Sequence, residues 1–234
     1  MALYRGDARR RTAHGGTLMT ASASDSRPAT TDALDILHLD DHLIALNKPA
    51  GLLSVPGRTE PDCLEARAQA LFPDALTVHR LDMATSGVMV MARGKSALAH
   101  LQQQFEKRET QKTYIAVVHG RMERDAGTID APLRCDWPNR PRQIVCYAKG
   151  RSALTHWHVL DRQADGTRLM LTPITGRSLQ LRVHMAIIGH SIIGDPWYGG
   201  RSADAQRLYL HAEQLRVRHP HTDAPLTLTA RTSF

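Results

Sequence analysis

The sequence predicts a mixed α and β fold, and two observations support this prediction. Strand candidates come in pairs around short polar turns, as in residues 34–39 and 43–47, which alternate apolar and polar side chains on either side of Asp40 and Asp41. Helix candidates are few and short, and they lie between the strand candidates. At 234 residues the chain can form one large domain or two small ones, and its sequence contains neither an internal repeat nor a long linker.

Three segments have the apolar spacing of helices. Residues 62–72 predict a short helix that ends at Pro73, and residues 95–108 predict a longer amphipathic helix. Thr175 is the predicted N-cap of the third helix, whose first turn would also favour anions through its backbone N–H groups. Its register places four side chains on neighbouring turns: Arg177, Gln180, Leu181 and His184.

Runs of β-branched and alternating residues predict the further strands. These strands span residues 88–92, 114–118, 155–160, 168–173, 208–217 and 226–230. Asp165 and Gly166 lie between two of them and predict a hairpin turn.

The most informative stretch for function is residues 79–87, His-Arg-Leu-Asp-Met-Ala-Thr-Ser-Gly. Its last three residues supply turn chemistry before a strand candidate, so we expect Arg80 and Asp82 on a loop that enters a sheet. Such loops commonly carry reactive side chains. Taken alone, the two residues could equally form a surface ion pair, which contributes about 0–1 kcal/mol.

The longer string resembles the catalytic segment of the RluA-type pseudouridine synthases, and other motifs of that family occur in the family's order. Residues 47–57, Asn-Lys-Pro-Ala-Gly-Leu-Leu-Ser-Val-Pro-Gly, resemble its upstream motif. Residues 112–116, Lys-Thr-Tyr-Ile-Ala, resemble the strand with its active-site tyrosine, and residues 175–184 resemble its basic helix-start motif. Later markers of the family are matched by Gly189-His190, Gly194-Asp195 and Leu210-His211-Ala212. The resemblance covers roughly residues 34–230.

The resemblance implies a single α+β pseudouridine synthase catalytic domain over residues 31–234, with a largely antiparallel mixed sheet, flanking helices and a central RNA-binding cleft. No separate S4-type RNA-binding domain is expected. The implied activity is an isomerisation: the N-glycosidic bond of a uridine is broken, the freed uracil turns, and it is rejoined through carbon. That reaction needs no cofactor and no metal. The base must leave its stack before it can react.

Three catalytic residues follow from the same resemblance. Asp82 is implied as the essential carboxylate and Arg182 as the partner that keeps it ionised against desolvation. Tyr114 is implied as the wall of the base and as a candidate for assisting proton removal from its carbon. Without the resemblance, a tyrosine in such a strand would be an ordinary core residue. Whether Asp82 attacks the sugar, attacks the base or removes a sugar proton stays open.

A second set of residues is expected to bind RNA. Arg80 is implied as the side chain that fills the gap left by the flipped nucleotide. Residues 134–143 combine the stacking surface of Trp137 with the cations of Arg140 and Arg142, although an ordinary Pro-rich connection would look alike. The remaining candidates are Lys48, His79, Arg177 and Gln180.

Within the family, the chain most resembles the members that act on two RNAs. Two features carry this resemblance: the run of residues 136–141 and the expected lack of an additional RNA-binding domain. The implied substrates are uridine 32 in the anticodon stem-loop of transfer RNA and uridine 746 in a stem-loop of large-subunit ribosomal RNA. Sequence-specific RNA recognition favours such loops because their bases can leave the stack at low cost.

Composition agrees with a polyanionic partner. The formal net charge is +7, and arginine outnumbers lysine by 25 to 5. Guanidinium groups pair with phosphate and stack on bases, which favours RNA contact. A GC-rich genome would produce the same bias without any function.

Cys63, Cys135 and Cys146 are widely spaced, which indicates neither a disulfide framework nor a zinc site and favours a reducing cytoplasm. No apolar run approaches the roughly 20 residues that span a bilayer, so we expect no membrane association. We also expect a monomer. Residues 1–30 have a net charge of +3 and no apolar period, which predicts a disordered basic tail, with Met19 as an alternative start.

One residue departs from the family pattern, and two other functions are alternatives to this interpretation. Leu179 occupies a position where the family usually has histidine, so one hydrogen bond to RNA or to a loop is expected to be absent. The first rival is a metal-dependent phosphoesterase or nuclease. It would use His79, Asp82, His184, His190, Asp195 and His211. The second is a catalytically idle RNA-binding assembly factor.

Overall fold

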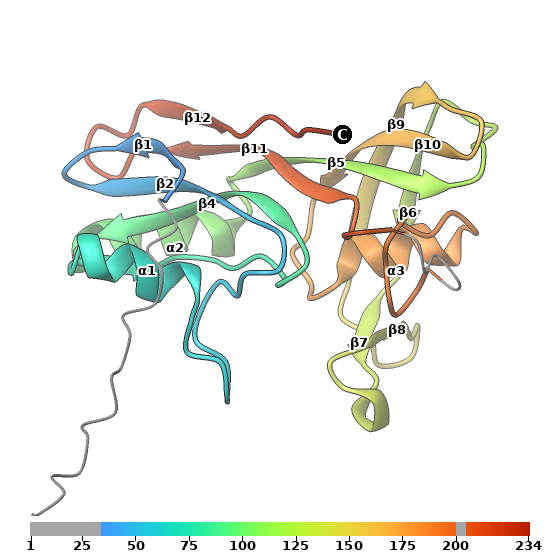
Figure 1. Ribbon diagram of the computed structural model, residues 1–234, viewed down its shortest axis with the longest axis horizontal. Helices are drawn as coiled ribbons and strands as arrows, with labels where there is room; N and C mark the ends of the chain where they lie inside the picture. Colours follow the sequence, from blue (N-terminus) through green and yellow to red (C-terminus); the bar gives the residue numbers. More distant parts are fainter. Residues whose placement is uncertain (1–33, 200–204) are drawn as a thin grey trace, which may run out of the picture. The chain divides into compact units, whose positions relative to one another are not determined.

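The computed structural model describes residues 34–199 and 205–234 (Figure 1). Within these residues the elements are, in chain order, β1 (Ile36–Leu39), β2 (Leu43–Lys48), α1 (Leu64–Leu71), β3 (Ala75–Thr77), β4 (Ser86–Arg93), α2 (Lys95–Lys107), β5 (Gln111–His119), β6 (Ala126–Asp130), β7 (Leu133–Cys135), the 3₁₀ turn η1 (Trp137–Asn139), β8 (Gln143–Val145), β9 (Leu154–Arg162), β10 (Gly166–Pro173), α3 (Gln180–Ile187), β11 (Leu210–Arg218) and β12 (Pro225–Thr229).

A large sheet has the strand order β1-β2-β4-β11-β5-β10-β9-β6, with β12 paired to β11 and β3 paired to β4. Its pairs are antiparallel except β4 with β11, which run parallel. Gly87 makes that parallel pair possible, because its φ is +113° and a Cβ there would collide with the backbone of Ala212. The expected largely antiparallel mixed sheet of an α+β fold is therefore confirmed.

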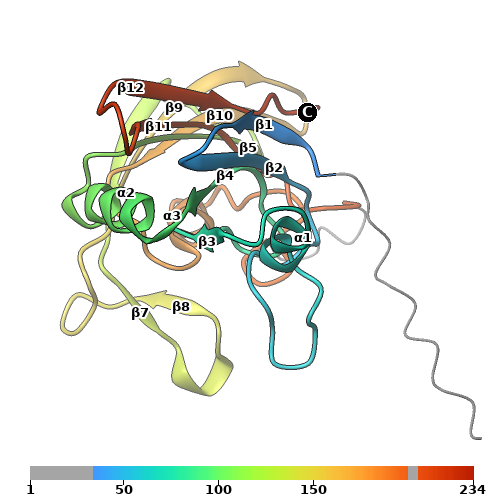
Figure 2. The same ribbon diagram turned by 90° about the vertical axis from the view of Figure 1, so that its left-hand side faces the viewer.

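Helices α1 and α2 cover opposite faces of β2 and β4 (Figure 2). Successive side chains of a strand point to opposite faces. Ile44 and Leu46 accordingly pack with α1, while Leu43 and Ala45 belong to the cluster that includes α2. The expected apolar face of the second helix is confirmed.

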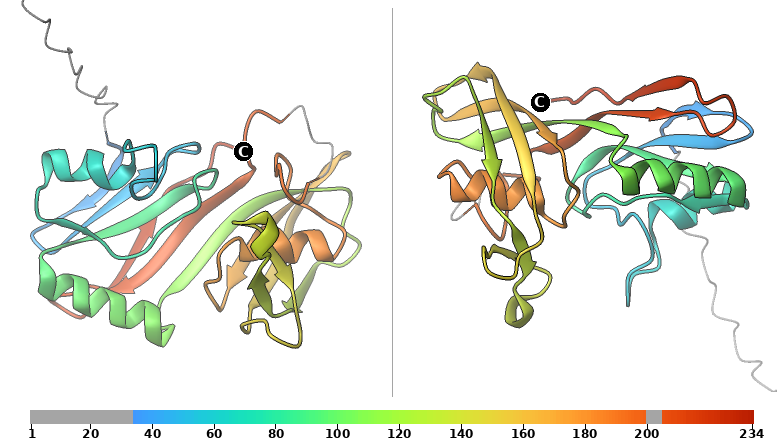
Figure 3. Two further views of the ribbon diagram at one scale, coloured as in Figure 1. Left: turned by 90° about the horizontal axis from the view of Figure 1, so that it is seen from below. Right: turned by 180° about the vertical axis from the view of Figure 1, so that it is seen from behind.

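Helix α3 packs on the other half of the sheet, against β5 and β10 (Figure 3). Leu181 and Met185 of the helix belong to one buried cluster with Ala116 and Val118 of β5 and with Leu171 of β10. This packing fixes the first turn of α3 over the strand that carries Tyr114.

The third helix begins later than expected. Leu179, in the left-handed region at φ 55°, is its N-cap, so the predicted cap at Thr175 is wrong. The Thr175 hydroxyl instead donates to Gln180 Oε1 at 2.7 Å, and the same oxygen accepts the backbone N–H of Arg177 at 3.0 Å. These two bonds stabilise a turn over residues 175–179 that takes the place of a first helical turn.

Four short strands were not predicted: β3, β6, β7 and β8. Strand β3 has three residues, and β6 contains alanine and glycine at its start, so neither has the alternating pattern that signals a strand. The expected connection at 134–143 lies in a separate two-stranded sheet, β7 with β8, closed by η1. The predicted basic tail at residues 1–30 lies outside the described residues. Within the described residues, no helix is long and apolar enough to cross a membrane.

Candidate active site

Asp82 lies on the loop between β3 and β4, as expected, and the residues on either side of it are anchored. Ser54 Oγ donates to the Leu81 carbonyl at 2.7 Å and accepts the Leu81 N–H at 3.1 Å. The Met83 carbonyl accepts the Gly51 N–H at 2.9 Å and Lys48 Nζ at 3.0 Å. The upstream motif at residues 47–57 therefore holds the loop from which Asp82 projects.

Lys48 is fully buried, and its ammonium group donates to three carbonyls, those of Pro49, Leu52 and Met83, at 2.9, 2.7 and 3.0 Å. Its three donors are used inside the protein, which argues against the predicted contact with RNA phosphate. Burial lowers its pKa to about 8, and the negative charge of Asp82 opposes that shift.

The carboxyl group of Asp82 has a pKa above its ordinary value. Burial is the largest cause, and the positive charges of Arg182, Arg80 and Lys48 oppose it, in that order. Asp195 adds a smaller upward effect. Arg182 is the largest of the effects that oppose burial, which is the direction expected of a cation that keeps Asp82 ionised.

Arg182, on the first turn of α3, forms its ion pair with Asp195. Its Nε and Nη2 donate to the two carboxylate oxygens at 2.7 and 2.6 Å, and both side chains are buried. Trp197 and Tyr198 lie over the guanidinium, at 4.7 and 5.7 Å from ring centroid to Cζ. Arg182 therefore acts on Asp82 through its charge, while Asp195 is its hydrogen-bonding partner. Sequence reasoning quoted Gly194-Asp195 as a family marker but missed this pairing.

Tyr114 is half-buried on β5, opposite Ala212 of β11 and Leu171 of β10. Burial and the negative charge of Asp82 raise the pKa of its hydroxyl above the usual value, so the hydroxyl is protonated at neutral pH. Its response to Asp82 shows that the two side chains are electrostatic neighbours. Among the described residues, the Tyr114 hydroxyl has no hydrogen-bond partner.

Two further RNA-contact candidates have internal partners instead. His79 Nε2 accepts the Val90 N–H at 3.1 Å and its ring stacks on Phe105 with centroids 4.6 Å apart, so burial lowers its pKa to about 3. Gln180 is buried, and its side-chain amide donates to Leu154 O and Thr155 Oγ1, both at 3.0 Å. Both residues stabilise the loops of the site, and their internal hydrogen bonds argue against the predicted direct contact with RNA.

The other candidates reach the surface. Arg80 is exposed, and the Trp137 side chain on η1 is 66% exposed with the Arg140 guanidinium 4.5 Å from its ring centroid. Arg142 lies 5.3 Å from the ring centroid of Tyr198. Arg177 is half-buried, and its Nε donates to the Ser152 carbonyl at 2.9 Å.

Leu179 is buried with Leu133, Ala153 and Val183 in a small apolar cluster. Its side chain therefore packs inward, under the small β7–β8 sheet. This placement explains how the chain accommodates leucine where the family usually has histidine.

The residues of the rival metal site have separate partners. His184 contacts Thr155 and Ala131, and His211 contacts Ser86 and Ala230. Across the described part of the chain, no group of three or more His, Cys, Asp or Glu side chains could hold a metal ion.

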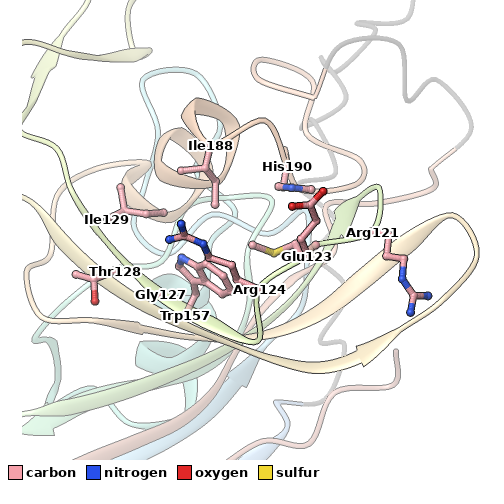
Figure 4. A pocket seen from close by; sticks show the side chains of 10 residues that line it. Arg121, Glu123, Arg124, Gly127, Thr128, Ile129, Trp157, Ile188 and His190 are labelled. Atoms are coloured by element: carbon pink, nitrogen blue, oxygen red, sulfur yellow. The ribbon is translucent and has the colours of Figure 1, made fainter.

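A cavity of about 460 Å³ opens beside β6 at the edge of the large sheet (Figure 4). Trp157, Arg121, Arg124 and His190 are among the residues that line it. No residue of the predicted catalytic or RNA-binding sets lines this cavity, so it is separate from the loop of Asp82. The cleft expected across the sheet stays a prediction.

The sheet has a parallel β4–β11 pair, and the anchored Asp82 is close enough to Tyr114 and Arg182 for their charges to interact. This combination of fold and site agrees with the class of RNA-modifying isomerases. A family profile described as RNA pseudouridylate synthase matches residues 42–187, and the chain belongs to this family.

Similar proteins agree with this membership. A protein from Yersinia pestis named dual-specificity RNA pseudouridine synthase RluA is 52% identical over 204 residues, 85% of this chain and 99% of its own. The protein of the same name from Escherichia coli K12 is 50% identical, over 86% and 94% of the two chains. Among solved structures, human RNA pseudouridylate synthase domain containing 1 superposes with a TM-score of 0.77 at 26% identity, covering 88% of this chain and 86% of that one. The chain is thus an RNA pseudouridine synthase.

Proposed function

We propose that Asp82 is the catalytic carboxylate of this isomerisation, that Tyr114 forms the wall of the uracil, and that Arg182 tunes the charge of the site. One observation carries the proposal: Asp82 raises the pKa of Tyr114, while the charges of Arg182, Arg80 and Lys48 act on Asp82. Groups clustered around a carboxylate with a perturbed pKa are typical of catalytic sites.

The isomerisation requires a carboxylate such as that of Asp82 and a group that moves a proton, such as the hydroxyl of Tyr114. The bond between C1′ of the ribose and N1 of uracil breaks, a bond between C1′ and C5 forms, C5 loses a proton and N1 gains one. Asp82 acts on the flipped nucleotide as its carboxylate form. The Tyr114 hydroxyl has no hydrogen-bond partner within the described residues and is protonated at neutral pH. It therefore takes up the proton that leaves C5 only as it passes its own proton to solvent, while N1 gains its proton from solvent, so that the hydroxyl acts as a proton relay.

The proposed RNA contacts fall into two groups, exposed side chains and half-buried side chains. Arg80 lies two residues before the carboxylate and is exposed, which suits a side chain that fills the gap left by a flipped base. Trp137 and Arg140 form an exposed stacked pair at the tip of the β7–β8 sheet, which suits contact with unpaired bases. Arg142 and Arg177 would contribute phosphate contacts.

For the substrate we propose two stem-loops, the anticodon arm of transfer RNA and a loop of large-subunit ribosomal RNA. The names of the bacterial relatives, which describe a dual specificity, support this choice. We also propose that the protein acts as a monomer, since all of the residues invoked belong to one chain. Its free thiols at Cys63, Cys135 and Cys146 agree with a cytoplasmic location.

The test compares the wild type with Asp82→Asn on both stem-loops, with pseudouridine formation measured by base-specific chemical mapping and RNA affinity measured separately. The amide keeps the shape of the side chain and removes the charge. We expect Asp82→Asn to bind RNA and to form no detectable pseudouridine. Asp41→Asn, which changes a side chain that is 97% exposed, is the matched control and should retain full activity.

Turnover by Asp82→Asn would refute the catalytic assignment. Activity of the wild type on long folded ribosomal RNA alone, with both isolated stem-loops ignored, would refute the proposed substrates and leave the assignment of Asp82 intact.

A further inference from the structure

Four positively charged side chains gather beside the catalytic loop, and we call Arg108, Lys112, Arg151 and Arg177 the basic cluster. They come from four separate places: the C-cap of α2, strand β5, the segment after β8, and the turn before α3. Arg108 and Arg151 are exposed, and the other two are half-buried.

Contacts around Phe105 and Gly176 bring these segments together. The Lys112 ammonium lies 5.2 Å from the ring centroid of Phe105, and the backbone N–H of Arg108 donates to the Phe105 carbonyl at 3.3 Å. On its other side, Lys112 Nζ lies 3.7 Å from the point that a Cβ on Gly176 would occupy. Gly176 directly precedes Arg177, so the lysine bridges the end of α2 and the turn before α3.

The positive charges act on one another. The pKa of Arg177 is lowered by burial and then by the charges of Arg151 and Arg108. A carboxylate would normally relieve such repulsion. Within the described residues none of the four forms an ion pair. The basic cluster is therefore a group of cations without a direct carboxylate partner in the part of the chain that the structure describes.

One member of the basic cluster, Lys112, lies near Tyr114. Lys112 and Tyr114 are two residues apart on β5, so their side chains share a face of the sheet and are separated by roughly 7 Å along the strand. That separation is close to the distance between successive phosphates of an extended RNA strand. Lys112 is also close enough to His79, three residues before Asp82, for its charge to act on that ring.

We propose that the basic cluster binds the backbone phosphates of RNA directly beside the nucleotide that reaches Asp82. This inference rests on the proposed function and assigns its phosphate contacts to residues other than those on the β7–β8 sheet. The guanidinium group of arginine forms bidentate hydrogen bonds with phosphate oxygens. Such contacts position RNA without reading its sequence. The cluster would thus fix the strand while Arg80 and Tyr114 engage the base.

The experiment measures the salt dependence of stem-loop binding. Removing one cation that binds a phosphate should reduce the slope of log K against log salt by roughly 0.7 for single-stranded RNA. The triple variant Arg108→Gln, Lys112→Met, Arg151→Gln should therefore reduce the slope by about 2. It should weaken binding to different loop sequences equally. Arg177 is left unchanged because its Nε holds the Ser152 carbonyl.

The matched control removes the same three charges elsewhere, as Arg121→Gln, Arg124→Gln, Lys95→Met, all at exposed positions outside the site. It should leave both the slope and the rate near wild type. Equal slopes for the two triple variants would overturn the proposal. So would a reduced rate at saturating RNA with an unchanged slope, because the cluster would then act on the catalytic loop.

Thermal unfolding checks that the triple variant is folded. If it is not, the single variants Arg108→Gln and Arg151→Gln, both at exposed positions, should each lower the slope by roughly 0.7, and unchanged slopes for both would overturn the proposal. Binding is measured without turnover. A wild type that binds RNA but forms no pseudouridine would therefore refute the proposed function, and the slopes would still decide the role of the basic cluster.

Discussion

Arg182 and Asp195 form a bidentate ion pair inside the protein, with Nε–Oδ2 and Nη2–Oδ1 distances of 2.7 and 2.6 Å. Asp195 also accepts the backbone N–H groups of Trp197 and Tyr198 at 2.9 and 3.1 Å. The carboxylate thus ties helix α3 to the segment that follows it. It also restrains the arginine whose charge acts on Asp82.

Asp195→Asn should be strongly destabilising, because it leaves the buried guanidinium of Arg182 without a counter-charge. Breaking a buried pair on one side costs about 3–5 kcal/mol of unfolding free energy. Denaturant unfolding would measure the loss. Arg218→Met, which breaks the exposed pair with Asp223, is the control and should change stability far less, because water screens an exposed pair. Similar losses for both variants would show that the Arg182–Asp195 pair is not structurally important.

Lys48→Met should lower both stability and turnover while leaving RNA affinity unchanged. The variant keeps the apolar stem but leaves three buried carbonyls without their donor, and each unsatisfied group costs about 1–3 kcal/mol. The Met83 carbonyl is one of them, so the loop of Asp82 should loosen. Unfolding free energy, single-turnover rate and RNA affinity would be measured together, with the exposed Lys107→Met as control. A reduced salt slope of binding would instead support a phosphate contact by Lys48.

Asp82→Asn should make the protein more stable at neutral pH. The folded pKa of Asp82 lies above the unfolded value of 3.8, so folding favours the protonated form. Its contribution to stability is full below pH 3.8 and is lost as pH rises through the folded pKa. Thermal unfolding across pH should therefore show Asp82→Asn above the wild type near pH 7, with the difference shrinking on acidification. Asp41→Asn should show no such trend, and a destabilised Asp82→Asn would mean that ionised Asp82 supports the fold.

The same shift predicts the acidic limb of the activity profile. Because the proposed mechanism uses the carboxylate form of Asp82, turnover should fall on acidification at a pH above the ordinary aspartate pKa of about 3.9. Single-turnover rates on a stem-loop measured across pH would locate this limb. A limb at or below the ordinary value would show that the bound RNA or the three cations overcome the effect of burial.

Tyr114→Phe should retain RNA binding and lose turnover. The ring, which forms the proposed wall, is unchanged, while the hydroxyl proposed to move a proton is removed. General acid–base groups contribute about 10²–10⁴-fold in rate, so we expect a loss of that size in single-turnover pseudouridine formation. Tyr209→Phe, at another half-buried tyrosine, is the control. Near-normal turnover by Tyr114→Phe would limit the role of Tyr114 to stacking.

Local patterns in the sequence predicted what neighbouring residues determine. The hairpins β1–β2 and β9–β10, the helix α2 and the loop position of Asp82 all follow from alternation, apolar spacing and turn residues within a few positions. The family motifs added the identity of the reaction, because their order along the chain is itself a sequence property.

Partners of polar side chains could not be predicted in this way. Lys48 looked like a phosphate ligand, yet it donates to Met83, which is 35 positions away. His79 and Gln180 looked accessible, yet their side chains form hydrogen bonds with the backbone of Val90 and Leu154, respectively. A polar group that is exposed and one that is buried with a partner have the same local sequence signal, since the difference depends on which distant segment packs against it.

The sequence by itself determined the class of reaction, the loop position of Asp82 and most strands and helices, because these depend on residue type and short-range spacing. Only the tertiary structure decided that Arg182 pairs with Asp195, that Asp82 has a raised pKa, and that the charges of Arg151 and Arg108 act on Arg177. Each of these depends on burial and on charges brought together from separate elements. Electrostatic interaction follows distance in space, and distance along the chain does not reveal it.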